Sequence, residues 1–371
     1  MLHFASLWVL AWAFYQPDLL AQVDAPTNTG PQNPFHALYT LFEPESAQPM
    51  RPGQFNAQVD FSVTNMYAFS TNAYITLRER ELWDTGQFKL CKDLQNLPDS
   101  YRWNCKSYGY SALFDGEIHQ RNYRLKYQSF NWLELSYIYR QVRLTGGKMD
   151  SFIEKFHGTT QISNANREWN DRNKLEIYLW DNQTGALFER TAETGYRKLS
   201  ETIGLKVLLW EEPGRNYLAL KISSKFHDTG YWKDLNEVPN TPISQMKDFD
   251  DYNLRLLYTA QRESWTGHVA YSRTLIKRPY FSQSPYHINF YFVGISYPWG
   301  LVQLLAQDLQ YSSIFPPSDL EPMNRDNNEL TLAMRYPTQS GLSIDSGFVE
   351  DITHGIANID FSIFLKVAQT W

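Results

Sequence analysis

The chain has 371 residues and a net charge of −6, which is too mild to indicate a nucleic-acid partner. Aromatic residues make up 16% of it, although the mean hydropathy is only −0.48. This combination is typical of transmembrane β-barrels, because only alternate residues of each strand face lipid and Tyr and Trp form girdles at both interfaces. The alternative is a large soluble β protein with an aromatic binding surface.

The beginning of the chain is interpreted as an export signal over residues 1–21. Phe4–Tyr15 is an apolar run too short to cross a bilayer as a helix, and cleavage is expected after Ala21. No Lys or Arg precedes this run, so a short buried segment of the mature protein is the alternative. Residues 22–52 then carry six prolines. They predict an irregular segment that hangs in the periplasm or enters the lower mouth of a barrel.

Residues 53–371 are predicted to form an all-β fold, an up-and-down antiparallel transmembrane barrel of about twelve strands. Phe55–Val63 and Ile359–Trp371 alternate most cleanly between apolar and polar side chains, which assigns one face to lipid and one to the lumen. Because a terminal strand would otherwise be an exposed edge, we predict that these two strands pair and close the barrel. The other strands are predicted near 116–128, 133–140, 203–211, 217–225, 253–261, 266–277, 287–297, 301–311, 329–336 and 342–348.

The connections between these strands are asymmetric. Those after even-numbered strands are short and those after odd-numbered strands are mostly long, as in outer-membrane barrels with periplasmic turns and extracellular loops. Three strands depart from alternation, and the two faces of the one near 266–277 are poorly separated. His287–Tyr297 is apolar on both faces, and Leu301–Tyr311 shifts its alternation midway, which predicts a bulge.

A long extracellular loop is predicted over residues 68–114, and it holds the only two cysteines, Cys91 and Cys105. Their close spacing in an exported chain predicts a disulfide, with two unpaired thiols as the alternative. Two cysteines without suitably spaced histidines make a poor metal site, so no metal and no other cofactor are expected.

A second long loop is predicted over residues 146–200. Within 146–157, Phe152 and Phe156 fall at helical spacing after a pair of glycines, with Asp150 placed where it could cap the helix. Farther along, residues 174–180 and 186–191 predict an extra hairpin outside the membrane.

The predicted helix supports two interpretations. It is either a constriction or lid that turns Asp150, Glu154 and His157 toward a pathway, or a plug of the upper mouth in which His157 is silent. Asp150, Ser151 and His157 are also the weak candidates for an enzymatic site, although three residues this close on one helix seldom converge on one atom.

The polar strand faces place more basic than acidic side chains in the lumen. This predicts a polar pathway mildly selective for anions, or else a network of salt bridges that fills a narrow barrel. Arg124, Arg140, Arg255 and Arg335 are the predicted pathway residues. They are joined by Lys126, Lys206, Lys221, Lys225 and Lys366, and by Asp60, Glu134, Glu329, Asp345 and Asp360.

Several stretches together resemble the DUF3187 family of bacterial outer-membrane proteins. The resemblance runs from about Asn33 to Trp371 and excludes the loop at 70–112. It departs after His157, where the family tends to continue with Phe-Gly and this chain has Gly158-Thr159-Thr160. It implies a barrel in the outer membrane and supplies no activity. The stretches are Asp115–Glu117, Gly146–His157, Arg167 and Gly347–Ile352.

The sequence therefore predicts a monomeric outer-membrane barrel of a Gram-negative bacterium that acts as a narrow, porin-like channel or uptake pore for a small solute. An enzyme that modifies lipid or lipopolysaccharide is the second candidate, and a closed structural or adhesion barrel is the third. The expected partners are outer-membrane lipid, a solute of unknown identity, and the barrel-assembly machinery, which would bind the terminal strand ending at Trp371. No nucleic-acid partner is expected.

Overall fold

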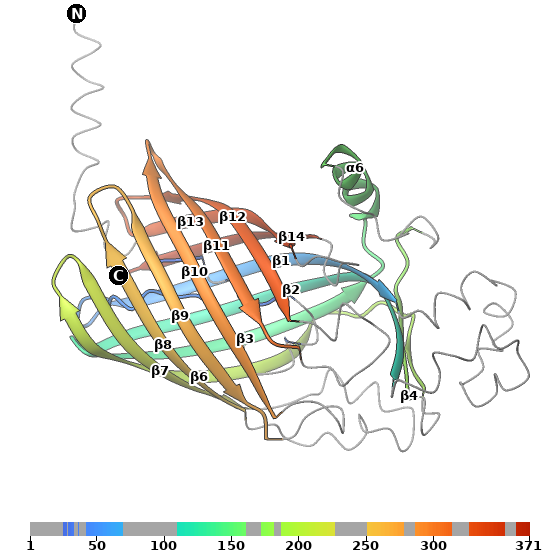
Figure 1. Cartoon of the computed structure of the whole chain (residues 1–371), viewed down its shortest axis with the longest axis horizontal. Coiled ribbons are helices and arrows are strands. Elements are labelled where there is room, and N and C mark those ends of the chain that lie inside the picture. Colours follow the sequence, from blue (N-terminus) through green and yellow to red (C-terminus); the bar gives the residue numbers. More distant parts are fainter. Residues whose placement is uncertain are drawn as a thin grey trace, which may run out of the picture.

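The computed structural model describes residues 25–27, 29–32, 36, 42–69, 110–160, 172–181, 187–226, 251–277, 286–313, 326–352 and 361–371. Its strands form one antiparallel sheet, and twelve of them close into a barrel (Figure 1). The twelve are β1 Phe55–Phe69, β2 Tyr110–Phe130, β3 Leu133–Thr145, β6 Arg197–Glu212, β7 Asn216–Phe226, β8 Tyr252–Gln261, β9 Thr266–Leu275, β10 His287–Trp299, β11 Val302–Tyr311, β12 Asn327–Pro337, β13 Leu342–Asp351 and β14 Phe361–Thr370.

The first and last strands pair as predicted, and this pairing closes the barrel. Strand β1 bonds to β14 on one side and to β2 on the other, with Val59 opposite both Val367 and Tyr123. Beyond the end of β14, the Trp371 amide donates to the Phe55 carbonyl at 2.9 Å, and the Phe55 amide donates to the Trp371 carbonyl at 3.2 Å. No strand edge of the barrel is left unpaired along this seam.

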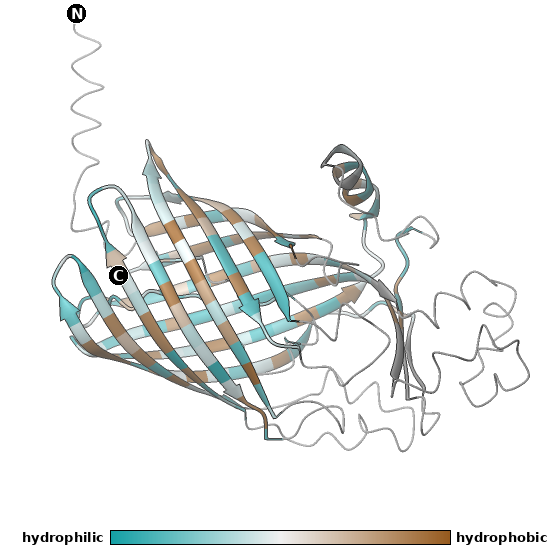
Figure 2. Ribbon diagram, in the orientation of Figure 1, coloured by the Kyte–Doolittle hydropathy of each residue, from teal (hydrophilic) through white to brown (hydrophobic). Residues whose placement is uncertain are grey.

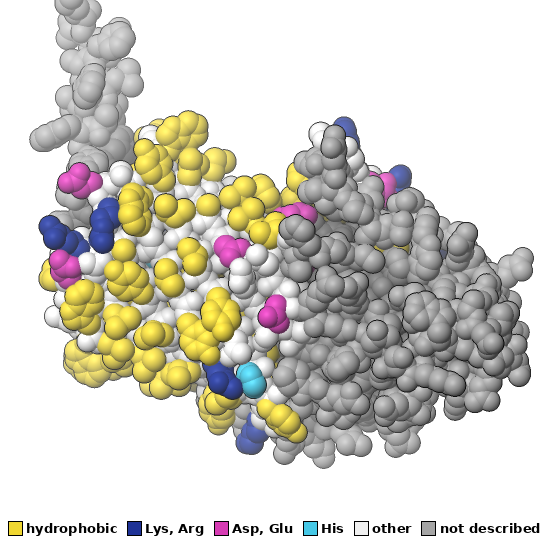
Figure 3. All heavy atoms as spheres, viewed as in Figure 1, with side chains coloured by type: hydrophobic (Ala, Val, Ile, Leu, Met, Phe, Trp, Pro, Cys, Tyr) yellow, Lys and Arg dark blue, Asp and Glu magenta, His cyan; other side chains and the backbone are white. Residues whose placement is uncertain are grey.

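Side chains alternate between the two surfaces of the wall. On β14, Leu365 points outward and is 45% exposed, whereas its neighbour Lys366 points into the lumen and is buried. The same alternation runs along the other strands (Figure 2), and hydrophobic side chains cover much of the visible outer wall (Figure 3). An apolar outer belt around a polar lumen is the architecture of a transmembrane barrel. No described helix is long and apolar enough to cross a membrane.

Aromatic side chains ring the end of the barrel that carries the short turns. Each lies at or near a short turn or the chain end at Trp371 and is exposed on the outer surface. By the loop asymmetry of outer-membrane barrels this is the periplasmic end, and the ring marks the inner interface of the membrane. The ring consists of Trp132, Trp210, Trp265, Trp299, Tyr336 and Trp371.

The two long predicted loops, 68–114 and 146–200, contain strand residues. The polar composition of these stretches did not predict them all. Strand β1 continues to Phe69 and β2 begins at Tyr110, so both ends of the predicted 68–114 loop are paired. The predicted hairpin is present as β4 (Glu176–Asp181) and β5 (Leu187–Arg190), and β4 pairs with the outer end of β2. Cys91 and Cys105 lie outside the described residues.

The predicted bulge in Leu301–Tyr311 is wrong. Strand β11 pairs without a register shift to both β10 and β12. Its alternation changes because Leu305 and Leu309 face the lumen and are buried there, while Leu304 faces outward. Part of the lumen is therefore apolar.

The division of each strand into a lipid-facing and a lumenal face leads to a prediction about stability. Replacing Leu365 with Arg would place a charge on the lipid-facing surface well inside the apolar belt, and should reduce the free energy of unfolding by about 2–4 kcal/mol. Denaturant unfolding in lipid vesicles measures this change, and heat-modifiable gel migration shows whether the barrel forms.

Gln369→Arg is the matched control. Gln369 lies on the same face of the same strand near the periplasmic interface, where the same charge should cost at most about 1 kcal/mol. Equal losses in the two variants would contradict the membrane placement of β14.

Candidate functional site

The described parts of the N-terminal segment, residues 25–27, 29–32, 36 and 42–50, lie in the lumen and form two legs. On the rising leg, the Ala25 carbonyl accepts a hydrogen bond from Arg335 near the periplasmic end of β12. Farther up, the Gln32 amide donates to Glu329 at 3.0 Å, and its side-chain oxygen accepts from the Ser362 hydroxyl at 3.2 Å. His36 then lies 3.1 Å from the Ser312 carbonyl at the extracellular end of β11.

The returning leg, residues 42–50, runs back toward the periplasm. The Ala47 amide donates to the Thr259 hydroxyl at 2.9 Å, and the Met50 amide donates to the Gln128 side chain at 3.2 Å. The chain then turns through Gly53, whose amide donates to the Gln128 carbonyl, and enters β1. Ala25 on the rising leg and Met50 on the returning leg therefore both lie near the periplasmic end.

Glu43 holds the returning leg to the barrel wall at mid-height. Its carboxylate accepts hydrogen bonds from two nitrogens of Arg124, at 3.0 and 2.9 Å, and another from Arg140 at 2.5 Å. Arg124 also pairs with Asp60 of β1. All four side chains are largely buried, so each charge depends on its partners rather than on water.

Glu45, two residues on, contacts strands β2, β7 and β8. Its carboxylate lies 2.9 Å from the Lys221 ammonium, 3.2 Å from the Arg255 guanidinium and 3.3 Å from the Lys126 ammonium. Lys206 pairs with Glu134 at 2.8 Å and donates to the Ser46 carbonyl at 3.2 Å. Two carboxylates of one irregular segment thus tie together strands β2, β3, β7 and β8.

A separate cluster holds the rising leg. Arg335 of β12 binds both oxygens of Asp345 at 2.7 Å, and Lys366 of β14 pairs with the same carboxylate. One Arg335 nitrogen is left to donate to the Ala25 carbonyl. The structure therefore places Arg124, Arg140, Arg255 and Arg335, four predicted pathway residues, in the lumen, each in contact with the N-terminal segment.

The other side of the lumen is apolar. The Phe42 ring stacks on Phe290 with centroids 6.0 Å apart and lies 5.7 Å from Phe292, both on β10. These lumenal phenylalanines explain why β10 is apolar on both faces. Farther round the wall, buried lumenal side chains of β11 to β14 form an apolar cluster of Leu305, Ala333, Val349 and Phe364.

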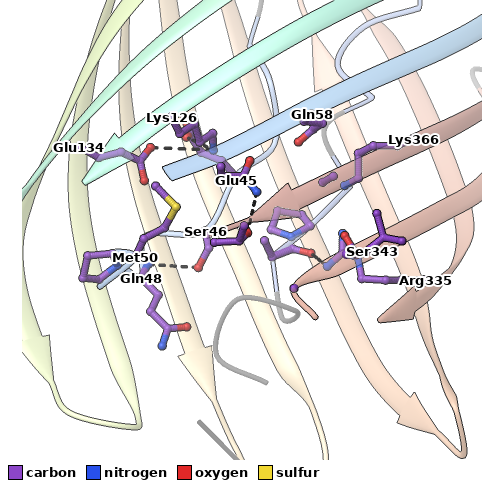
Figure 4. A pocket seen from close by; sticks show the side chains of 18 of the residues that line it. Glu45, Ser46, Gln48, Met50, Gln58, Lys126, Glu134, Arg335, Ser343 and Lys366 are labelled. Carbon is purple, nitrogen blue, oxygen red and sulfur yellow. Dashed lines mark hydrogen bonds and ion pairs between the residues drawn. The ribbon is translucent and has the colours of Figure 1, made fainter. Parts of the chain in front are cut away.

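A cavity of about 110 Å³ lies between the two legs at the periplasmic end. Figure 4 shows Glu45 and Ser46 on the returning leg facing Arg335 and Lys366 across this space. Some free space therefore remains between the legs at the periplasmic end, whereas ion pairs of Glu43 cross the lumen higher up.

Three buried polar atoms near the Glu43 cluster are not hydrogen-bonded within the described parts of the chain. The second terminal nitrogen of Arg140 and the hydroxyls of Ser200 and Thr202 have no hydrogen-bond partner among the described residues. Ser200 lies directly across the strand pair from Arg140, and Thr202 lies across from Lys225. A guanidinium nitrogen and two hydroxyls on one lumenal wall could bind an anionic group.

The predicted helix is present as α6 (Asp150–Thr160), but it lies outside the barrel. The Asp150 carboxylate accepts hydrogen bonds from the Asn65 side chain at 3.0 Å and from the Asn173 amide at 2.6 Å. Asn65 shares the outward face of β1 with Phe61, which is 40% exposed. The prediction that Asp150 faces the pathway is therefore wrong.

Glu154, another predicted residue of this helix, does not face the lumen either. Glu154 binds Arg172 at the protein surface, and these hydrogen bonds raise the pKa of the Arg172 guanidinium. The His157 side chain lies outside the described parts. Within those parts, no group of three or more His, Cys, Asp or Glu side chains could hold a metal ion.

Comparison with known proteins gives a family match over part of the chain. The model of the family described as "Protein of unknown function (DUF3187)" matches residues 103–230. The match agrees with the resemblance at 115–117 and 146–157, and it does not extend to 347–352. No curated protein matches the chain in sequence.

Several solved outer-membrane proteins have similar folds. The COG4313 outer membrane channel from Pseudomonas putida F1 is 7% identical, with 89% of this chain and 100% of that chain covered and a TM-score of 0.49. The P. putida toluene transporter TodX is 9% identical, with 87% and 91% covered and a TM-score of 0.36. A Pseudomonas aeruginosa FadL homologue is 9% identical, with 87% and 90% covered and a TM-score of 0.37. Likenesses this distant carry no information about the solute.

Sequence reasoning missed Phe42, Glu43 and Glu45, the residues that fill the lumen. Two signals pointed to them. One was the surplus of basic lumenal side chains, which needed carboxylates from elsewhere in the chain. The other was the presence of two acidic residues beside an aromatic one in a proline-rich stretch whose only other charged residues are Asp24 and Arg51.

The ion pairs predict how the returning leg is held. Replacing both Glu43 and Glu45 with Ala should release residues 42–50, because the basic wall would lose its carboxylate partners and the leg its main anchors. A cysteine at Ser46, with Cys91 and Cys105 changed to Ser, should then react with a water-soluble maleimide at least about tenfold faster.

The control removes the same charge elsewhere. Glu211 and Glu212 lie at the exposed end of β6, so Glu211→Ala/Glu212→Ala should leave the labelling rate at Ser46→Cys unchanged. Equal rates in the parent and both double variants would show that the carboxylates do not hold the leg.

Proposed function

We propose that the protein is an outer-membrane channel for amphipathic anions, and that its lumen is closed by its own residues 42–50. The observation that carries this proposal is the chemistry of the closing segment. An apolar ring, Phe42, lies against Phe290 and Phe292, while the adjacent Glu43 carboxylate lies against Arg124 and Arg140.

The closing segment thus acts as a tethered substitute for the solute. A lumen with one apolar wall and one basic wall suits a molecule with an apolar body and a carboxylate or similar anionic group. The unsatisfied atoms of Arg140, Ser200 and Thr202 would supply a first contact for that anionic group beside the Glu43 position. When the solute takes these contacts, the leg loses its anchors.

The closed structural barrel is the second candidate, because the ion pairs with Glu43 and Glu45 fill the lumen at mid-height. Flux measurements separate the two functions. The lipid-modifying enzyme has no such support, because the structure holds Asp150 in contact with Asn65 and Asn173.

Planar-bilayer recording of the purified barrel tests the channel. The native chain should be closed or open rarely, and Glu43→Ala/Glu45→Ala should give steady, anion-selective conductance. A variant lacking residues 25–50 should conduct at least as much. Heat-modifiable migration verifies that each barrel is intact.

Solute chemistry is tested on the open variant. Octanoate should block the conductance at about tenfold lower concentration than acetate or octylamine, because only octanoate matches both walls. Arg124→Gln/Arg140→Gln in the open variant should abolish this preference, and Arg215→Gln/Arg262→Gln, at exposed periplasmic turns, should preserve it. An intact barrel without residues 25–50 that carries no current would instead support the structural barrel.

A further inference from the structure

We propose that α6 is a membrane-surface helix that inserts its phenylalanines into the outer leaflet and anchors the extracellular rim of the barrel to lipid. The proposal is independent of the channel function. It rests on where the helix is attached, which side chains it presents, and its height on the barrel wall.

The attachment places α6 on the outside of the wall. Before the helix, the amides of Lys148 and Met149 donate to the Glu117 carboxylate at 2.6 and 2.5 Å. Glu117 and Asn65 are direct partners across β1 and β2 and share the outward face. Gly147 has a φ of 74°, and a side chain there would collide with Glu117, so glycine is required for this path. Figure 1 shows α6 beside the barrel rather than over its mouth.

The helix presents an aromatic face that continues the apolar belt. Phe152 and Phe156 lie 5.6 and 5.4 Å from the ring of Phe361, which in turn stacks on Phe348 of β13. Phe361 shares the outward face of β14 with Ile363 and Leu365, yet it is only 4% exposed. Phe152, by contrast, is 52% exposed. The cluster joins the lipid-facing wall and leaves one large apolar ring uncovered.

The height of the cluster matches the outer interface. Ten residues separate Phe361 from Trp371, which lies in the periplasmic aromatic ring. At about 3.4 Å per residue and a tilt of about 40°, they rise about 26 Å, close to the apolar band of about 25 Å of such barrels. Phe152 and Phe156 therefore lie where acyl chains meet headgroups.

The charges of this region suit an anionic surface. Lys148 and Lys155 are exposed and flank the aromatic face, while the carboxylate of Glu154 is engaged by Arg172. Apolar rings with long basic side chains beside them are typical of helices that lie in a membrane interface, with the ammonium groups reaching the phosphates. The outer leaflet of the protein's own membrane is thus the partner that fits this surface.

Spin-label accessibility tests the proposal in full-length protein with Cys91 and Cys105 changed to Ser, reconstituted in vesicles of phospholipid and lipopolysaccharide. Thr159 is exposed and lies seven residues after Phe152, on the same side of the helix. For a label at Thr159→Cys, we expect the ratio of its collision rate with oxygen to its collision rate with a water-soluble nickel complex to be high. This ratio should be at least about threefold higher than the ratio for a label exposed to water. A label at Gly158→Cys, where a side chain has open space, should remain accessible to nickel.

A second variant separates lipid insertion from simple burial. Phe152→Ser/Phe156→Ser should return the Thr159 label to nickel accessibility without altering heat-modifiable migration. Equal nickel accessibility at positions 158 and 159 in the parent vesicles would overturn the proposal. An oxygen preference at 159 that survives the double substitution would overturn it as well.

Discussion

The pairing of two carboxylates with a basic wall is the interaction on which the rest of the lumen depends. Around the returning leg, the described strands bring six cations together, Arg124, Lys126, Arg140, Lys206, Lys221 and Arg255, but only two carboxylates, Asp60 and Glu134. Each buried charge that is left unpaired costs several kcal/mol. These basic side chains therefore could not be buried away from water without further carboxylate partners. Glu43 and Glu45 double the number of carboxylates to four and contact five of the six cations, so the irregular segment becomes part of the barrel's electrostatic balance.

The same interaction explains why so loosely structured a segment has a defined path. Residues 42–50 form no helix or strand, so few of their backbone groups are bonded within the segment. The barrel supplies partners instead, such as Thr259 for the Ala47 amide and Gln128 for the Met50 amide. Phe42 fixes the orientation by reaching the apolar wall while Glu43 reaches the basic one. In an open lumen, both kinds of contact would have to be replaced. Water would replace Glu43 at the basic wall, and an apolar molecule would replace Phe42 at the apolar wall.

The strand alternation of the sequence was enough to predict twelve strands and their closure, because lipid on one side and a polar lumen on the other impose a period of two. It failed where the lumen itself is apolar. In Leu301–Tyr311 the alternation predicts a bulge, although Leu305 and Leu309 are buried on the lumenal face of a strand that pairs without a register shift. Such breaks in the alternation record the chemistry of the lumen, but only the three-dimensional pairing shows which face they belong to.

The position of α6 could not be predicted for a related reason. Helical spacing correctly identified Phe152 and Phe156 as one face, but the surface on which that face packs is decided by Glu117, Asn65 and Asn173, which are distant in sequence. Asp150 and Glu154 therefore lie on the outside of the barrel. The residues that fill the lumen belong to the N-terminal segment instead.

The route of the N-terminal segment also decides how the barrel could open. A chain threaded once from one end to the other would have to be pulled through its full length, past every charged pair. Here the rising leg at Ala25 and the returning leg at Met50 are both held near the periplasmic end, and His36, between them in sequence, lies at the far end. A loop of this kind can be withdrawn as a loop, without threading. Ten residues from Glu43 to Gly53 span at most about 35 Å when extended, which exceeds the height of the apolar belt. In the proposed opening, the leg would be long enough to clear the lumen while β1 remains in the wall, and the carboxylate pairs, rather than the length of the tether, would set the barrier.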